Sequence, residues 1–144
     1  MISRRSVYRK EAGLPRGDDS SVNRGVDAET LEFIQKYLTS YTKWEMLKYF
    51  AENPTATETA RSLARRLNKD VRQITEAFKS LARTGIVGNG QGSEDAAYSL
   101  TADESQRAVL FRIAESVKAN NRFRLLLNYH ITKASLAKYK SRDF

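Results

Sequence analysis

From residue 27 onward, apolar side chains recur every three or four positions, the spacing that places them on one face of an α-helix. The first such stretch starts at Asp27, a residue type that caps helix N-termini. The apolar positions of this predicted helix are Leu31, Ile34, Leu38 and Tyr41, with Phe33 and Tyr37 in a second line. Two apolar lines indicate a helix that packs against more than one neighbour.

Three later helix starts match the capping box, in which a Thr side chain and an acidic side chain three residues on satisfy free backbone amides. They are residues 42–45, 55–58 and 101–104, and Thr59 is an equally good cap for the second of them. After 42–45 we expect a helix that ends at Asn53-Pro54 and buries Trp44, Leu47, Phe50 and Ala51.

Between residues 59 and 84, the pattern predicts a short helix, a tight turn at Asn68-Lys69 and a longer helix capped by Asp70 and ended by Gly85. The inward positions are Ala60, Leu63, Ala64 and Leu67 on the short helix, and Val71, Ile74, Phe78 and Leu81 on the longer one. The outward positions of the short helix are therefore basic, namely Arg61, Arg65 and Arg66.

A short hairpin follows, with one strand from Ile86-Val87, a glycine-rich turn at 88–92 and a return strand over 97–100. Two more helices are predicted, with a break at Asn120 or Asn121. Their inward positions are Val109, Leu110, Ile113, Ala114 and Val117, then Phe123, Leu126, Leu127, Ile131 and Ala134. The sequence thus predicts a mainly α fold with a small β-hairpin.

Both ends of the chain differ from this pattern. Gly, Pro and Ser interrupt every period in residues 1–26, which predicts a basic, flexible arm. Residues 139–144 form a basic tail that we expect to fray.

Composition narrows the function. The 144 residues include no Cys and one His, which excludes disulfides, thiol chemistry and Cys-based metal sites. The glycine-rich turn lacks the Lys-Ser/Thr ending of a phosphate loop, and we find no catalytic constellation. The sequence therefore predicts a non-enzyme without cofactor or metal, located in the cytoplasm with no signal peptide or membrane span.

Charge points to an anionic partner. The formal net charge is +8, and residues 59–84 alone hold seven basic and two acidic side chains. A central basic block of this kind favours nucleic acid as the partner and an association with the nucleoid.

The order of these elements resembles the winged helix-turn-helix domain of MarR- and ArsR-type bacterial regulators. The resemblance runs over residues 59–100 and is strongest in Ser62–Val87, SLARRLNKDVRQITEAFKSLARTGIV. It implies a winged helix domain over 27–138, with the helix-turn-helix at 59–84, the wing at 86–100, and flanking helices that form a homodimer. It also implies a transcriptional regulator that binds duplex DNA sequence-specifically, with helix 70–84 in the major groove. The resemblance also allows a small-molecule effector, but no residue of this sequence identifies such a ligand.

Helical projection of residues 70–84 gives the candidate base-reading side chains Arg72, Gln73, Thr75, Glu76 and Lys79. Candidate phosphate contacts are Thr59, Arg61, Arg65, Arg66 and Lys69. The wing offers Asn89 and Gln91, and the arm offers Arg4, Arg5, Arg9 and Lys10 to an adjacent groove. The candidate dimer contacts are Leu31, Phe33, Tyr37, Phe123, Leu126 and Tyr129.

The wing departs from the family pattern because it has no Lys or Arg and carries Glu94 and Asp95. Two alternatives therefore stay open. One is a winged-helix adaptor that binds another protein without specific DNA binding, and the other is nonspecific nucleoid or RNA binding through the basic ends. The DNA site, the sign of regulation and the regulated process are not encoded in any pattern that we recognise.

Overall fold

The computed structural model describes residues 26–89, 95–101 and 103–142, with side chains as far as residue 137. The expected basic arm lies outside these residues except for Val26, and so do its Arg4, Arg5, Arg9 and Lys10. Gln91 and Glu94 of the wing are also outside them.

Six helices and three short strands make up the described part of the chain. The helices are α2 (Ala28–Tyr37), α3 (Tyr41–Glu52), α4 (Ala60–Leu67), α5 (Val71–Arg83), α6 (Glu104–Ala119) and α7 (Asn121–Arg142). The strands are β1 (Thr57–Thr59), β2 (Val87–Gly88) and β3 (Ala97–Leu100). The predicted mainly α fold with a small hairpin is confirmed, and the layout is consistent with a winged helix.

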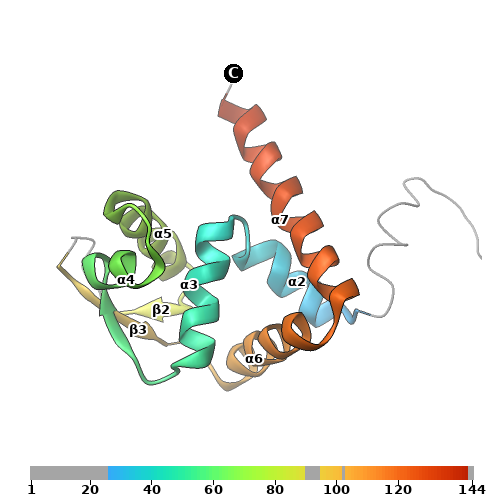
Figure 1. The fold of residues 1–144 in the computed structure, drawn as a ribbon, viewed down its shortest axis with the longest axis horizontal. Coiled ribbons are helices and arrows are strands. Elements are labelled where there is room, and N and C mark those ends of the chain that lie inside the picture. Colours follow the sequence, from blue (N-terminus) through green and yellow to red (C-terminus); the bar gives the residue numbers. More distant parts are fainter. Residues whose placement is uncertain (1–25, 90–94, 102, 143–144) are drawn as a thin grey trace, which may run out of the picture.

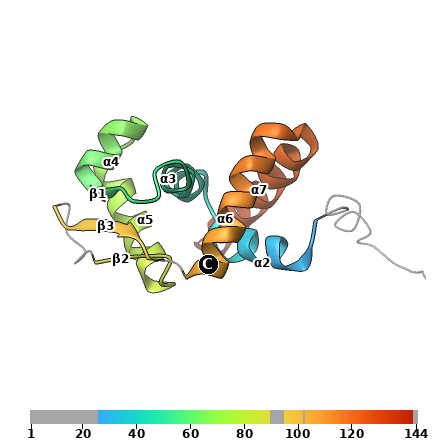
Figure 2. The ribbon, with the colours of Figure 1, turned by 90° about the horizontal axis from the view of Figure 1, so that it is seen from below.

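The elements fall into two groups on either side of α3 (Figures 1 and 2). On one side lie α4, α5 and the sheet, and on the other lie α2, α6 and α7. The sheet is antiparallel with the order β1-β3-β2, so the return strand of the hairpin pairs on both sides. Strand β1 was not predicted, because its three residues are too few to show an alternating pattern.

One continuous apolar core joins the two groups. Leu47 and Phe50 of α3 are fully buried, as are Phe78 of α5 and Leu110 of α6. The ring of Phe78 stacks on the ring of Tyr98 of β3, with centroids 4.2 Å apart and planes 7° from parallel. This contact fixes the longer helix of the helix-turn-helix to the sheet.

Some predicted helix caps are confirmed. The Asp27 carboxylate accepts a hydrogen bond from the Thr30 amide at 2.8 Å and caps α2. Thr59, rather than the box at 55–58, caps α4, and Ser62 completes a reciprocal pair with it. Asp70 caps α5 as predicted.

The other two predicted capping boxes, at 42–45 and 101–104, are also wrong. Ser40 caps α3, while Thr42 is buried and accepts a hydrogen bond from the Gln73 side chain at 2.8 Å. Asp103 caps α6, while the hydroxyl of Thr101 donates to the carbonyl of Gly85 at 3.1 Å. In both cases a contact with a distant segment engages the Thr hydroxyl.

The outer helices differ from the prediction in two respects. Tyr41 begins α3 instead of ending the first helix, because the chain turns at residues 38–40. Helix α7 continues to Arg142, beyond the expected boundary at residue 138, and its C-terminal part projects from the body of the protein (Figure 1). Among the described residues, no helix is long and apolar enough to cross a membrane.

Candidate nucleic-acid interface

The helix-turn-helix unit is built by α4, a short turn and α5. Asn68 ends α4 in the left-handed conformation with φ 57°, which Asn tolerates better than most residues, and this allows the tight turn. The side chain of Asp70 then accepts the amide of Gln73 at 3.3 Å and starts α5. Gly85, with φ 83°, leads from α5 toward the hairpin.

Two arginines near this turn extend into solvent without a partner in the described part of the chain. Arg65 lies in the last turn of α4 and Arg72 in the first turn of α5, and both are exposed. No ion pair or hydrogen bond engages either guanidinium there. Both therefore remain available to an anionic ligand.

The other predicted phosphate-contact cations already have acidic partners. Arg61 pairs with Asp95 of the wing at 3.6 Å, and Lys69 pairs with Glu45 of α3 at 3.3 Å. Arg66 pairs with Glu58 of β1 at 3.0 Å. A phosphate must compete with these carboxylates. Each paired cation therefore contributes less free energy to phosphate binding than an unpaired cation does.

The candidate base-reading residues differ in their solvent exposure and in whether another side chain or the backbone already binds them. Arg72 is exposed and unpaired within the described residues, whereas Glu76 and Lys79 form an ion pair with each other at 3.4 Å. Thr75 is only 8% exposed, and its hydroxyl donates to the carbonyl of Val71 at 2.8 Å. Thr75 is therefore poorly placed to contact a base.

The side chain of Gln73 also forms a hydrogen bond within the chain. Its side-chain amide donates to the buried hydroxyl oxygen of Thr42 on α3. Helical projection placed Gln73 on the outward face of α5, but projection contains no information about a neighbouring helix that reaches its side chain.

Sequence reasoning missed a buried carboxylate beneath α4. Glu58 is 6% exposed and accepts hydrogen bonds from the hydroxyls of Tyr49 at 2.5 Å and Ser62 at 2.6 Å, besides its ion pair with Arg66. The bond to Glu58 raises the pKa of the Tyr49 hydroxyl above its ordinary value. The guanidinium of Arg66 also lies 5.9 Å from the centre of the Tyr49 ring. The spacing of Glu58, Ser62 and Arg66, four residues apart, is the only sequence signal for this cluster.

The wing is described only at its base. Asn89 is exposed with φ 73°, and Asp95 is 85% exposed at its side chain while it pairs with Arg61. The described part of the wing thus presents a carboxylate toward α4 and contains no Lys or Arg.

The predicted dimer residues are mostly internal. Phe33, Tyr37 and Leu126 are buried within a single chain, and Leu31, Phe123 and Tyr129 are half-buried. The large apolar side chains that α7 does expose are Leu125 at 60% and Leu136 at 58%. Among the side chains of α7 that the structure describes, these two leucines are therefore the best placed for an apolar contact with another molecule.

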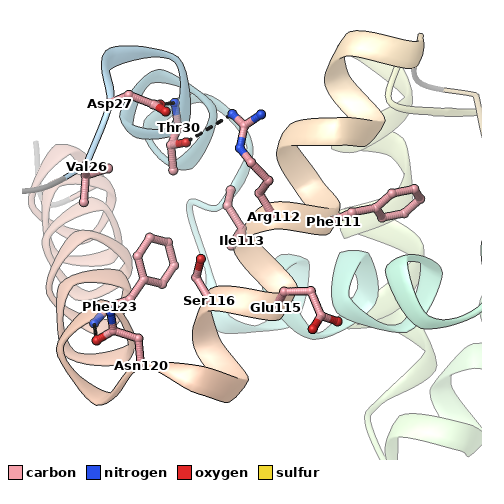
Figure 3. A pocket seen from close by; sticks show the side chains of 10 residues that line it. All are labelled: Val26, Asp27, Thr30, Phe111, Arg112, Ile113, Glu115, Ser116, Asn120 and Phe123. Carbon is pink, nitrogen blue, oxygen red and sulfur yellow. Dashed lines mark hydrogen bonds between the residues drawn. The ribbon is translucent and has the colours of Figure 1, made fainter.

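A cavity of about 540 Å³ lies between the N-terminus of α2 and the helices α6 and α7. Figure 3 shows the Phe123 ring and the Ser116 hydroxyl beside it, with Arg112 near Thr30 at its edge. The Arg112 guanidinium is paired with Glu29 at 3.1 Å. The cavity belongs to the group of helices across α3 from the helix-turn-helix.

The other ionisable and metal-ligating side chains that the structure describes do not gather into a second site. His130 is buried, and its ring lies edge-on to Tyr129 with centroids 5.1 Å apart. No cluster of three or more metal-ligating side chains occurs within the described ranges.

Comparisons with protein-family models, curated proteins and solved structures return no match to this chain. Its functional interpretation therefore depends on its own geometry and charge.

Proposed function

We propose that this protein binds duplex DNA sequence-specifically, with α5 in the major groove, and acts as a dimeric transcriptional regulator. The observation that carries the proposal is that Arg65 and Arg72, at the turn between α4 and α5, are exposed and that neither guanidinium has a partner among the described residues. Reading helices contact base edges through residues near their N-termini, where Arg72 lies.

The two arginines have different roles in this proposal. Arg72 addresses the O6 and N7 atoms of guanine, the commonest specific contact of an arginine in the major groove. Arg65 on α4 contacts phosphates, which position the protein without reading sequence. Arg61 joins Arg65 when a phosphate displaces Asp95 from it.

Dimerisation is assigned to α7. Leu125 and Leu136 are eleven residues apart, three helical turns, and so lie on one face of the helix. Each is more than half exposed, and the two leucines offer separate apolar contacts to a second copy, with Thr132, which lies 3.4 Å from the Tyr41 hydroxyl, between them. A dimer would present two reading helices to one DNA site, with the half-sites related by the two-fold axis.

The test is fluorescence anisotropy with duplexes of about 30 base pairs at 50 and 200 mM salt, the range over which a protein with 6–10 phosphate contacts loses about 10³–10⁵ in affinity. We expect salt-sensitive binding by the wild type and much weaker binding by the double variant Arg65→Ala/Arg72→Ala. Selection from a random duplex pool should then recover a preferred site, and Arg72→Ala alone should relax that preference.

The matched control is Arg122→Ala/Arg124→Ala on α7. It removes the same charge from exposed positions outside the helix-turn-helix. Equal losses of DNA affinity for the two double variants would mean that net charge alone drives binding. A wild type that does not bind duplex DNA would exclude the proposed function.

The second candidate is an adaptor that binds a protein through the winged core. It is favoured by the pairing of Arg61, Arg66 and Lys69 with internal carboxylates, which leaves the helix-turn-helix less cationic than its composition indicates. A wild type that does not bind any duplex at low salt would favour this candidate.

A further inference from the structure

The hydrogen bond between Gln73 and Thr42 joins the N-terminal turn of α5 to that of α3. The distance from Nε2 of Gln73 to Oγ1 of Thr42 is 2.8 Å, and Thr42 is 6% exposed. Because this bond spans 31 positions of sequence, it links two helices that local structure does not hold together. It acts at the end of α5 that carries Arg72.

The residues beside Thr42 contact α7. The hydroxyl of Tyr41 donates to Oδ1 of Asn128 at 3.2 Å and lies 3.4 Å from Oγ1 of Thr132. The hydroxyl of Ser135 donates to the carbonyl of Thr39 at 3.5 Å. Three polar contacts thus connect the start of α3 with the middle of α7.

We propose that Gln73 is a positioning residue rather than a base reader, and that Thr42 and Tyr41 connect the orientation of the reading helix to α7. This inference rests on the proposed function and specifies how its site is regulated. Whatever binds or displaces α7 shifts the start of α3, and Gln73 transmits that shift to the turn of α5 that carries Arg72. Residues 39–42 make the hydrogen bonds to α5 and also those to α7, so the coupling between these two helices passes through this one segment.

A double-mutant cycle separates the two roles of Gln73. Thr42→Val removes the acceptor while it keeps the shape of the side chain, and Gln73→Ala removes the donor. If both break one bond, each lowers the affinity for the selected duplex about threefold to tenfold, and the double variant is no weaker than the single ones. Thr42→Ser keeps a hydroxyl and should restore binding.

A base-reading Gln73 gives the opposite result. Gln73→Ala would then relax the sequence preference at one base pair, and its effect would add to that of Thr42→Val. Additivity overturns the proposal. Thr84→Val is the matched control and should leave DNA affinity unchanged, because Thr84 follows the C-terminus of α5 and its hydroxyl donates to the carbonyl of Leu81 of that helix.

The connection to α7 is tested from the other end. Asn128→Ala and Tyr41→Phe each remove one partner of an exposed bond and should each weaken DNA binding about twofold in the wild-type background. Neither should have a further effect when Thr42 is already Val. Asn121→Ala on the same helix should leave affinity unchanged, because the Asn121 side chain accepts a hydrogen bond from Arg124 of α7 and has none with α3 among the described residues.

The outcomes distinguish this inference from the proposed function. A wild type that does not bind duplex DNA overturns both. A wild type that binds, combined with additive effects of Thr42→Val and Gln73→Ala, overturns only the positioning role. If the effects of Thr42→Val and Gln73→Ala are not additive but Asn128→Ala leaves the DNA affinity unchanged, the positioning role stands and the connection to α7 is overturned.

Discussion

Glu58 and Arg66 form an ion pair, with 3.0 Å between Oε2 and Nε, in which the Glu58 side chain is 6% exposed and the Arg66 side chain is 59% exposed. The carboxylate also accepts the hydroxyls of Tyr49 and Ser62, so one buried anion binds side chains from α3 and α4 to β1. Part of the charge of Arg66 is therefore used to hold the fold, and α4 has fewer available cations than its sequence indicates.

The pH dependence of stability should report on Glu58. Burial raises the pKa of this carboxyl, but hydrogen bonds from Ser62, Tyr49 and Arg66 and the charge of Arg66 outweigh burial, and the pKa lies below its ordinary 4.5. A lowered pKa in the folded state means stability that is fully present above about pH 4.5 and is lost as the pH falls through the folded value. We expect Glu58→Gln to lower the free energy of unfolding at pH 7 by about 1–3 kcal/mol.

Urea unfolding of wild type and Glu58→Gln between pH 7 and pH 3 measures this effect, and the difference should narrow below about pH 4.5. Glu45→Gln, which breaks the half-exposed pair with Lys69, should cost about 0–1 kcal/mol. A pH-independent difference for Glu58→Gln would show that its ionised form is not what stabilises the fold.

Thr75 should not contribute to sequence preference. Its hydroxyl bonds to Val71 in the same helix, and the side chain is buried. Thr75→Val should therefore leave the preferred base at every position unchanged and the affinity within about twofold. Selection from a random duplex pool with this variant, beside Arg72→Ala, makes the comparison. A changed consensus for Thr75→Val would place that side chain at the DNA.

Asp95 should weaken DNA binding in the wild type. Its carboxylate pairs with Arg61 and adds a negative charge beside α4. Asp95→Asn should raise the affinity for all duplexes alike, by up to about fivefold at low salt, because an exposed pair is worth about 0–1 kcal/mol. Glu115→Gln removes an exposed carboxylate from α6 and is the control. If both substitutions raise affinity equally, the contact with Arg61 is irrelevant.

The exposed leucines of α7 should control the oligomeric state. Leu125→Asp/Leu136→Asp places a charge at each of the two proposed dimer contacts, so light scattering after gel filtration should give the mass of one 16.4 kDa chain instead of two. Each leucine is more than half exposed, so the thermal unfolding midpoint of the isolated chain should change little. Asn121→Asp adds charge to α7 without removing apolar surface and should leave the dimer intact. A wild type that is itself monomeric contradicts the assignment.

The sequence predicted the helices because their buried faces follow the helical period. Ile74, Phe78 and Leu81, for example, are at 0%, 0% and 1% exposure. Local capping was predicted where the cap serves its own helix, as for Asp27 and Asp70. It failed at Thr42 and Thr101, because a segment remote in sequence engages each hydroxyl.

The candidate site was predicted less well than the fold, for a related reason. The exposure of Arg61, Arg65 and Arg66 follows from helical projection, but the availability of each charge depends on its partner. Asp95 is 34 positions beyond Arg61 and belongs to the wing. Only the folded chain brings such pairs together, so the sequence alone does not separate Arg65 from its two neighbours.

The stacked rings of Phe78 and Tyr98 have a consequence for engineering. Because Tyr98 anchors the return strand directly on α5, the base of the hairpin is secured independently of the loop that connects its strands. Lysine or arginine substitutions at residues 90–94, which lie outside the described residues, would therefore leave this contact between α5 and the hairpin unaltered. Under the proposed function, such variants would add positive charge to the wing without changing α5, so the contributions of the two elements to DNA binding could be measured separately.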